Sequence, residues 1–353
     1  MGQFLLKRVF HMFPILLGVS LLTFLLLDLT PGDYFTALEN NPQITKERLD
    51  QLRAKWHLDE PWYVQYGYWL KNIWFADGKM GDLKAAWNRE GDGKVGRVLK
   101  LALLPDFGDS LQYKQPSSQL IALRLWNTFL LSLMAMILAW GVALPLGIWA
   151  AVKKDTWVDR TCSGIAFLGL SIPEILLGLL ALMFAYSTGW FPIGGVESDK
   201  YYGVEEWSIP RVIDRCHHLI LPAAVLAASS LAGLMRQMRS NLLDTLRAEY
   251  VTTARAKGLS EGWVIYKHAL RNAINPLLTI FGYSLAHLLS GAFIVENVMS
   301  WPGLGRLTLE ALQQQDYPLV VAAVLMATAL LVAGNFVADL LLAWSDPRIR
   351  LEK

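Results

Sequence analysis

Polar side chains inside the apolar stretches are the first candidates for chemistry. Glu174 and His287 fall well within such stretches, and Ser284 and Ser290 lie on either side of His287. Ionisable groups in hydrocarbon are costly and often mark a solute pathway or a proton relay. Hydrogen bonding between neighbouring helices explains them equally well. We keep all four residues as possible pathway lining. A proton-coupled carrier would need more such groups, usually paired, so their scarcity disfavours that class.

Motifs for nucleotide, metal or covalent chemistry do not stand out. The sequence contains no G-x-x-x-x-G-K-[ST], and the pair Gly303 and Gly305 is followed by Thr308 where a dinucleotide motif needs glycine. The triplet from Cys216 to His218 has no partner Cys/His cluster, and adjacent residues rarely point at one ion. We therefore expect no catalytic, cofactor-binding or metal-binding residue, and no enzyme activity in this chain.

The most basic stretch runs from 236 to 272, between two apolar segments, and holds seven Lys or Arg against three acids. Gly258 interrupts its helical pattern, and Ser260 predicts the N-cap of a second helix. Four residues ahead of the break recur at helical spacing and predict one apolar face: Leu243, Leu246, Tyr250 and Ala254. The stretch predicts a helix, a turn and a helix. Spacing alone leaves two roles open: a rigid element that docks into another subunit, or a basic loop lying on anionic lipid.

This stretch resembles the cytoplasmic coupling loop of ABC importer permeases. The general signature, E-A-A then glycine, is matched in part, because Thr252 and Thr253 replace its Glu and first Ala. The permeases of dipeptide, oligopeptide and nickel importers are much closer. Five segments carry that resemblance, with the start of the chain at 16–33 as a sixth: Glu249–Leu259, His268–Ala273, Ser300–Arg306, Asp316–Pro318 and Asp346–Arg350.

The resemblance implies a type I ABC importer permease fold and the first of two homologous permeases. The implied partners are a sister permease, two cytoplasmic ATPase subunits that hold ATP and Mg, an extracytoplasmic substrate-binding protein, peptide substrate and the bilayer. Transport would proceed by alternating access. The implied coupling residues are Glu249, Tyr250, Ala254, Arg255, Lys257, Gly258 and Leu259. Of these, Tyr250, Ala254 and Leu259 would pack against the ATPase.

Three alternatives stay open. Related permeases carry nickel or oligosaccharides, so the same fold could serve those cargoes. A stand-alone carrier or channel is a different class, which would transport without an ATPase. A membrane-embedded enzyme would need a catalytic constellation that the sequence does not contain.

Composition indicates a polytopic membrane protein. The 353 residues are 54% hydrophobic and 18% charged, against about 25% charged in soluble domains. A net charge of +2 gives no argument for nucleic acid. We expect six membrane-spanning helices at 9–27, 127–152, 163–187, 219–235, 274–295 and 319–343. Basic residues gather in alternate short loops, which predicts cytoplasmic N- and C-termini in the inner or plasma membrane.

The predicted organisation has three parts. Residues 1–29 form the first transmembrane helix, 30–120 an enlarged extracytoplasmic loop region, and 121–353 the transmembrane domain with its coupling loop. The loop region is expected to hold a helix at 45–56 and aromatics that form an interfacial belt, a docking surface or both. The segment 78–115 has no readable role. The turn from Trp301 to Gly303 is expected outside, as a lid or dimer contact. Asp28, Asn127 and Asp339, near span ends, are expected to be structural.

Overall fold

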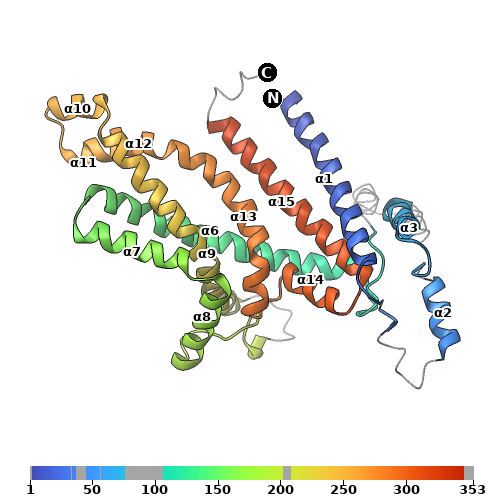
Figure 1. Cartoon of the computed structure of the whole chain (residues 1–353). Coiled ribbons are helices and arrows are strands. Elements are labelled where there is room, and N and C mark those ends of the chain that lie inside the picture. The colour runs from blue at the N-terminus through green and yellow to red at the C-terminus, as the bar shows by residue number, and fades with distance from the viewer. Residues whose placement is uncertain are drawn as a thin grey trace. The chain divides into compact units, whose positions relative to one another are not determined.

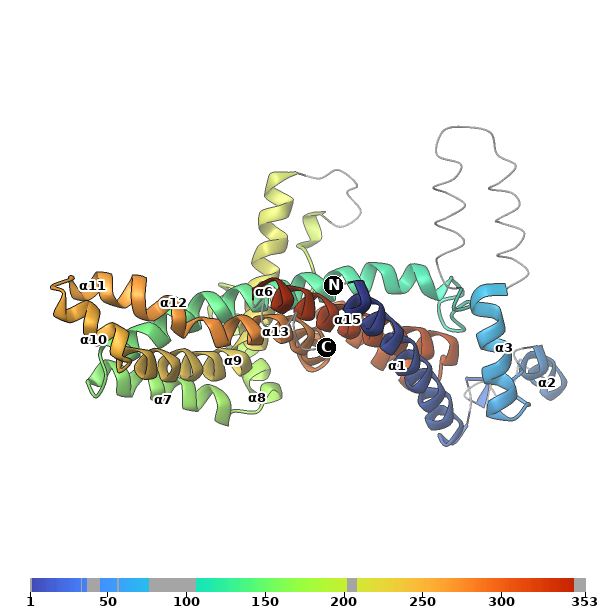
Figure 2. The ribbon, with the colours of Figure 1, turned by 90° about the horizontal axis from the view of Figure 1, so that it is seen from above.

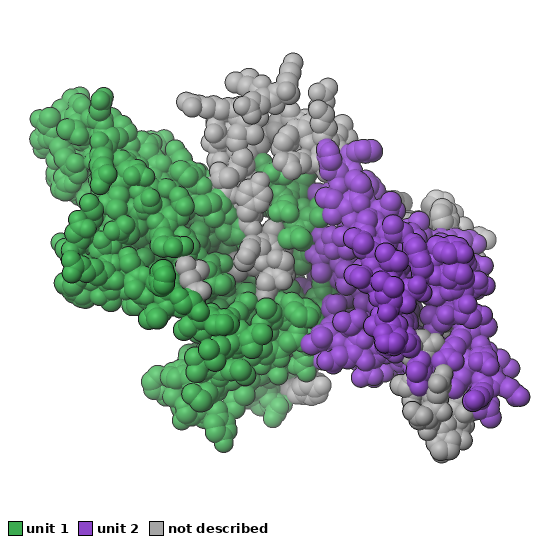
Figure 3. All heavy atoms as spheres, in the orientation of Figure 1, with its two compact units in different colours: residues 1, 126–306, 330–353 green, residues 2–125, 307–329 purple. Residues whose placement is uncertain are grey.

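The computed structural model describes residues 2–32, 34–36, 45–55, 57–75, 106–201 and 208–345. Within these ranges the chain is built of helices, and its only extended pairing is an isolated bridge between Asp109 and Pro116. The predicted all-α class is confirmed for this part. The chain divides into two compact units, one of residues 126–306 with 330–353 and the other of 2–125 with 307–329 (Figure 3). Most of the segment 78–115 lies outside the described residues.

The unit that contains the N-terminal helix is held together by aromatic side chains. It includes α1 (Gly2–Asp28), α2 (Lys46–Lys55) and α3 (Trp62–Phe75) (Figure 1). Phe24 of α1 lies 5.2 Å from the ring of Tyr66 and 5.3 Å from that of Trp69, both on α3. The Tyr66 hydroxyl also lies 3.0 Å from Ser20 Oγ. Part of the predicted aromatic belt therefore packs inside this unit. The helix expected at 45–56 is confirmed as α2, and Trp56 lies outside the described residues.

The larger unit is organised around α9 (Ile209–Leu246), which packs against α7 (Trp157–Ser171), α8 (Glu174–Thr188) and α13 (Asn275–Val298). It also holds most of α6 (Ser117–Val152) and the end of α15 (Tyr317–Ser345). Small side chains allow close approach: a Cβ on Gly147 of α6 would lie 2.7 Å from the Met235 carbonyl of α9. Close contact through small residues is a usual way to pack helices in lipid.

Among the described residues, four helices are long and apolar enough to cross a membrane: Phe10–Asp28, Ser117–Val152, Ile209–Leu246 and Tyr317–Val337. The pair α7 and α8 would make a fifth if it forms one broken span. The helix α13 covers the span expected at 274–295, but most of its side chains from 279 to 291 lie outside the described residues. Six spans therefore remain a prediction.

The span predicted at 163–187 is not one continuous helix. The chain bends by 103° between α7 and α8, at Ile172 and Pro173 (Figure 1). Proline lacks an amide hydrogen and disfavours helical geometry at the residue before it. Ile172 accordingly has extended backbone angles of φ −87° and ψ 122°. Glu174 thus begins a helix at the bend instead of lying inside a continuous span.

The helix α9 extends beyond the predicted span 219–235 at both ends, to 38 residues. The apolar face predicted from Leu243 through Ala254 is also wrong, because α9 ends at Leu246 and a new helix begins at Glu249. Ala248 between them is extended, with φ −67° and ψ 145°. Leu246 packs against the core, whereas Tyr250 faces outward.

Candidate functional site

The coupling region, residues 236–272, consists of the last turns of α9 and a small packed unit that follows them. It contains α10 (Glu249–Ala256), α11 (Glu261–Trp263), a π-helix (Val264–Ala269) and α12 (Leu270–Ala273). Figure 2 shows α10 and α11 together at the far end of the larger unit. The α10 helix packs against the π-helix, and Val251, Ala254, Val264 and Ala269 are buried between them. The predicted helix, turn and helix is thus present, with a π-helix in place of a regular second helix.

Gly258 makes the turn between α10 and α11. Its φ is +76°, a conformation that residues with a Cβ adopt only with strain. No heavy atom lies within 4 Å of where its Cβ would be, so backbone conformation alone requires glycine here. Its amide donates to the Arg255 carbonyl at 2.9 Å. This is a left-handed C-terminal cap on α10.

Arg255 and Glu261 brace this turn from one side to the other. The Arg255 guanidinium donates to both carboxylate oxygens of Glu261, at 2.7, 3.1 and 3.3 Å, and its Nη1 donates to the Leu246 carbonyl at 3.3 Å. These hydrogen bonds lower the pKa of Glu261 below its usual value and raise that of Arg255. The side chains are 58% and 40% exposed, so solvent screens the pair. Arg255 therefore braces the turn while 40% of its side chain stays exposed.

The other predicted coupling residues divide between surface and interior. Glu249, Tyr250, Lys257 and Leu259 are exposed, while Ala254 is buried within the region. The Tyr250 hydroxyl accepts a hydrogen bond from Asn272 Nδ2 at 2.8 Å, which fixes the ring at the surface.

Sequence reasoning missed the second half of this surface. Trp263 and Tyr266 are both more than half exposed, and the ammonium of Lys267 lies 4.5 Å from the centre of the Trp263 ring. It also missed Glu261 as the partner of Arg255. Their types were visible in the sequence, but the π-helix changes which residues share a face, so regular spacing could not place them.

Polar contacts join the coupling region to neighbouring helices. Arg239 of α9 donates two hydrogen bonds of 2.6 Å to the carboxylate of Asp159 on α7. Asp159 also accepts from the Asp155 amide at 3.1 Å, in the loop that follows α6. Asn241 Nδ2 donates to the Ala273 carbonyl of α12 at 3.2 Å. These contacts join the last turns of α9 to α7 and to α12.

The residues predicted to line a pathway are not all brought together. Glu174 stands at the bend before α8, and its Oε1 is buried without a hydrogen-bond partner among the described residues. Ser284 of α13 lies apart from it, at a groove of about 330 Å³ between α9 and α13. The side chains of His287 and Ser290 lie outside the described residues. The groove is lined by Ser229, Ser230, Gly233, Leu234, Gln237, Ile280 and Ser284.

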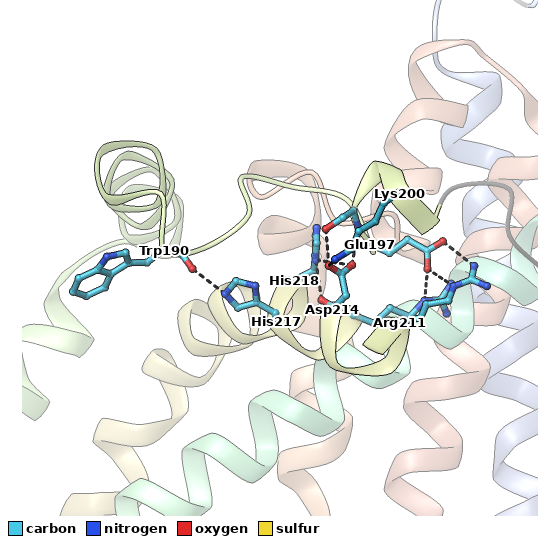
Figure 4. Close-up of polar contacts among 9 residues, drawn as sticks. Trp190, Glu197, Lys200, Arg211, Asp214, His217 and His218 are labelled. Atoms are coloured by element: carbon cyan, nitrogen blue, oxygen red, sulfur yellow. Dashed lines mark hydrogen bonds and ion pairs between the residues drawn. The ribbon is translucent and has the colours of Figure 1, made fainter. Parts of the chain in front are cut away.

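At the opposite end of α9 a network of charges fastens the preceding loop (Figure 4). Glu197 accepts from Arg211 at 2.8 and 2.9 Å and from Arg215 at 2.8 Å. These two guanidinium groups lower the pKa of Glu197 to about 2. Asp214 accepts from the Ser198 amide at 2.7 Å. The network fixes the start of α9 to the loop that follows α8.

The two adjacent histidines in this network do not form a metal site. His217 Nε2 lies 2.8 Å from the Trp190 carbonyl, whereas His218 Nδ1 lies 2.9 Å from the Asp214 carbonyl. Figure 4 shows their rings directed to different neighbours. Within the described part of the chain, no group of three or more His, Cys, Asp or Glu side chains could hold an ion.

The segment 300–306 is anchored inside its own unit by a buried carboxylate. Glu296 is fully buried and accepts from the Thr128 hydroxyl at 2.5 Å and from the Gly305 and Arg306 amides at 2.7 and 3.2 Å. These amides belong to the first turn of α14 (Leu304–Gln313), where a negative charge is stabilising. A Cβ on Gly303 would lie 2.0 Å from Glu296, so only glycine fits there.

The turn that begins at Trp301 is likewise buried against α6. Trp301 Nε1 donates to the Asn127 carbonyl at 3.1 Å, and Asn127 Nδ2 donates to the Pro302 carbonyl at 2.8 Å. Trp301 is only 2% exposed, so its side chain anchors the turn against α6. A lid or dimer contact formed by the turn stays a prediction. Asn127 has the structural role expected of it.

Comparison with family models identifies the family of this chain. A family model described as the inner membrane component of binding-protein-dependent transport systems matches residues 143–351, which include the whole coupling region. The chain belongs to this family. A second model, for the N-terminal part of such components, matches residues 1–86.

Full-length relatives of this transport component are peptide permeases by name. The chain is 39% identical over 351 residues to the oligopeptide transport system permease protein AppB of Bacillus subtilis, covering 99% of both chains. It is 36% identical over 354 residues to a putative peptide permease of Brucella suis, covering 99% of this chain and all of the relative. It is 35% identical over 370 residues to the dipeptide transport system permease protein DppB of Escherichia coli K12, covering all of both.

Proposed function

We propose that this chain is a permease subunit that moves dipeptides and oligopeptides across the cell membrane in an ATP-driven ABC importer. The observation that carries the proposal is the coupling region, which includes the end of α9 and exposes the side chains of Tyr250 and Leu259. The full-length similarity to AppB and DppB supports peptides as the cargo.

In this proposal the chemistry of ATP takes place on two partner ATPases, and this chain receives the motion. The coupling region would insert into a cleft of one ATPase through Glu249, Tyr250, Lys257 and Leu259. Gly258 and the Arg255–Glu261 pair would keep the inserted helix at a fixed angle. Closure of the ATPases would move α9 and α7 together through the Asp159–Arg239 contact and open the pathway outward. Hydrolysis would return it to face inward.

The complete assembly we propose contains a sister permease, the two ATPases and an extracytoplasmic binding protein that delivers substrate. This chain would contribute six spans in a type I fold, an enlarged outer loop after the first span, and both termini in the cytoplasm. Lys153 and Lys154, in the loop between α6 and α7, would then lie on the cytoplasmic side with the coupling region. The pathway would be lined by Glu174, Ser284, His287 and Ser290.

A mild-detergent purification of this chain from its native membrane tests the proposal directly. Mass spectrometry should find two ATPases and a second permease, and any bound extracellular protein should release peptides. Transport of a solute by the purified chain alone, in vesicles without ATP, would instead support a stand-alone carrier and refute the coupling role.

A further inference from the structure

The groove between α9 and α13 has a chemistry of its own. Its volume of about 330 Å³ is at the small end of the ~300–1,000 Å³ range of ligand pockets. Four of the seven lining residues that the structure describes are polar and uncharged. Three carry hydroxyls, Ser229, Ser230 and Ser284, and one carries an amide, Gln237. None of the lining residues that the structure describes carries a carboxylate, imidazole, thiol or cationic group. It therefore offers hydrogen bonds without offering charge.

Most of these groups present acceptors to the groove. The Ser229 hydroxyl donates to the Leu226 carbonyl at 3.0 Å, and that of Ser284 to the Ile280 carbonyl at 2.9 Å. A hydroxyl has one hydrogen and two lone pairs, so both oxygens keep acceptor capacity. Gln237 Nε2 donates to Asn241 Oδ1 at 2.8 Å, which leaves its carbonyl oxygen available as well. Such a surface suits a ligand with neutral N–H donors.

Gly233 leaves the floor of the groove open. Glycine inside a helix is less stable than alanine, so a packing reason is expected for it. Gly147 and Gly178 have such a reason, because a Cβ on either would lie less than 3 Å from a neighbouring atom. No atom lies within 4 Å of a Cβ placed on Gly233. The space beside it is therefore free for a main chain to approach closely.

We propose that this groove binds the main-chain amides of the transported peptide, with Ser229, Ser230, Gln237 and Ser284 accepting hydrogen bonds from its N–H groups. This inference rests on the proposed function and specifies what the permease reads in its cargo. Contact with the main chain accepts peptides of any side-chain sequence.

Protection from a thiol reagent tests contact with the substrate. Ser230→Cys is placed in the full importer with exposed Cys216 changed to serine, and its maleimide labelling rate is measured with and without trialanine. Ser240→Cys, on the same helix but outside the groove, is the matched control. We expect trialanine to slow labelling at 230 at least threefold and not at 240. Equal rates with and without trialanine would mean that the peptide does not cover position 230. No labelling at 230 would mean that another subunit or lipid occupies the groove. Either result would overturn the inference.

A transport ratio tests the recognised group. Uptake of trialanine is compared with uptake of the analogue whose peptide nitrogens are methylated and so lack N–H. The triple variant Ser229→Ala, Ser230→Ala, Ser284→Ala should reduce this ratio at least fivefold, whereas Ser240→Ala should preserve it. The binding protein is the same in both, so its selectivity cancels. An unchanged ratio refutes the groove while leaving peptide transport intact; no trialanine uptake by the unaltered importer refutes the proposed function itself.

Discussion

Two glutamates in the larger unit are held in opposite ways. Glu296 is fully buried and accepts from the Thr128 hydroxyl, 168 positions away, and from two amides of the turn that follows it. Glu261 is 58% exposed and shares one arginine six residues away. Buried donors that lose their shared acceptor strongly destabilise a fold, whereas an exposed ion pair contributes little to stability. The first glutamate therefore fixes the fold, and the second sets the local shape of the surface that we propose docks onto an ATPase.

The largest expected effect comes from removing the buried carboxylate. Glu296→Ala deprives the Thr128 hydroxyl and the Gly305 and Arg306 amides of their shared acceptor. We expect a loss of about 1–3 kcal/mol for each buried donor left without an acceptor, measured as a lower thermal midpoint of the detergent-purified importer. Glu261→Ala should leave the midpoint nearly unchanged. Equal midpoints for the two variants would remove the distinction drawn between these regions.

The next effect concerns the backbone of the exposed region. Gly258→Ala forces an L residue into the left-handed conformation at a cost of about 1–2 kcal/mol, so ATP-coupled uptake should fall about tenfold while the chain remains in the membrane. Gly262→Ala is the matched control, because its Cβ also meets nothing within 4 Å but its φ is not positive. Similar uptake by the two variants would show that the turn does not depend on glycine.

Glu197 provides an intermediate case, with a side chain 11% exposed and two arginine partners. Its pKa in the folded chain, about 2, lies below the ordinary value of 4.5. Its contribution to stability is therefore complete above about pH 4.5 and is lost as the pH falls toward 2. Thermal midpoints measured across this window should fall more for the unaltered importer than for Glu197→Gln. Parallel pH profiles would show that these arginines do not stabilise its charge.

The smallest effect is expected from the exposed pair itself. Arg255→Glu and Glu261→Arg should each lower ATP-coupled uptake several-fold, and the double exchange should restore part of it, with a coupling energy of roughly 0.5 kcal/mol. Thermal midpoints should change little in all three. Additive losses in the double variant would mean that Arg255 contacts a partner instead of bracing the turn.

The sequence predicted what depends on local composition and failed where distant residues meet. Apolar runs located the long helices, and Gly258 located the turn. The bend before Glu174 was also readable, because Pro173 disfavours helical geometry at Ile172, yet the high hydropathy on both sides hid it. The contact between Thr128 and Glu296 spans 168 positions, and no spacing rule could supply it. The pairing of Arg255 with Glu261 depends on the turn geometry, which side-chain type alone does not specify.

The length of α9 also sets limits on how this chain can move. Arg215 and Arg236 are 21 residues apart on one helix, a rise of about 32 Å, close to the ~30 Å depth of the hydrocarbon core. Sliding the helix along its axis would draw one of these arginines into hydrocarbon, at a cost of several kcal/mol. Tilting keeps both near the headgroups. In the proposed importer, closure of the ATPases would therefore tilt α9 within the membrane, because the two arginines oppose movement of the helix along its axis.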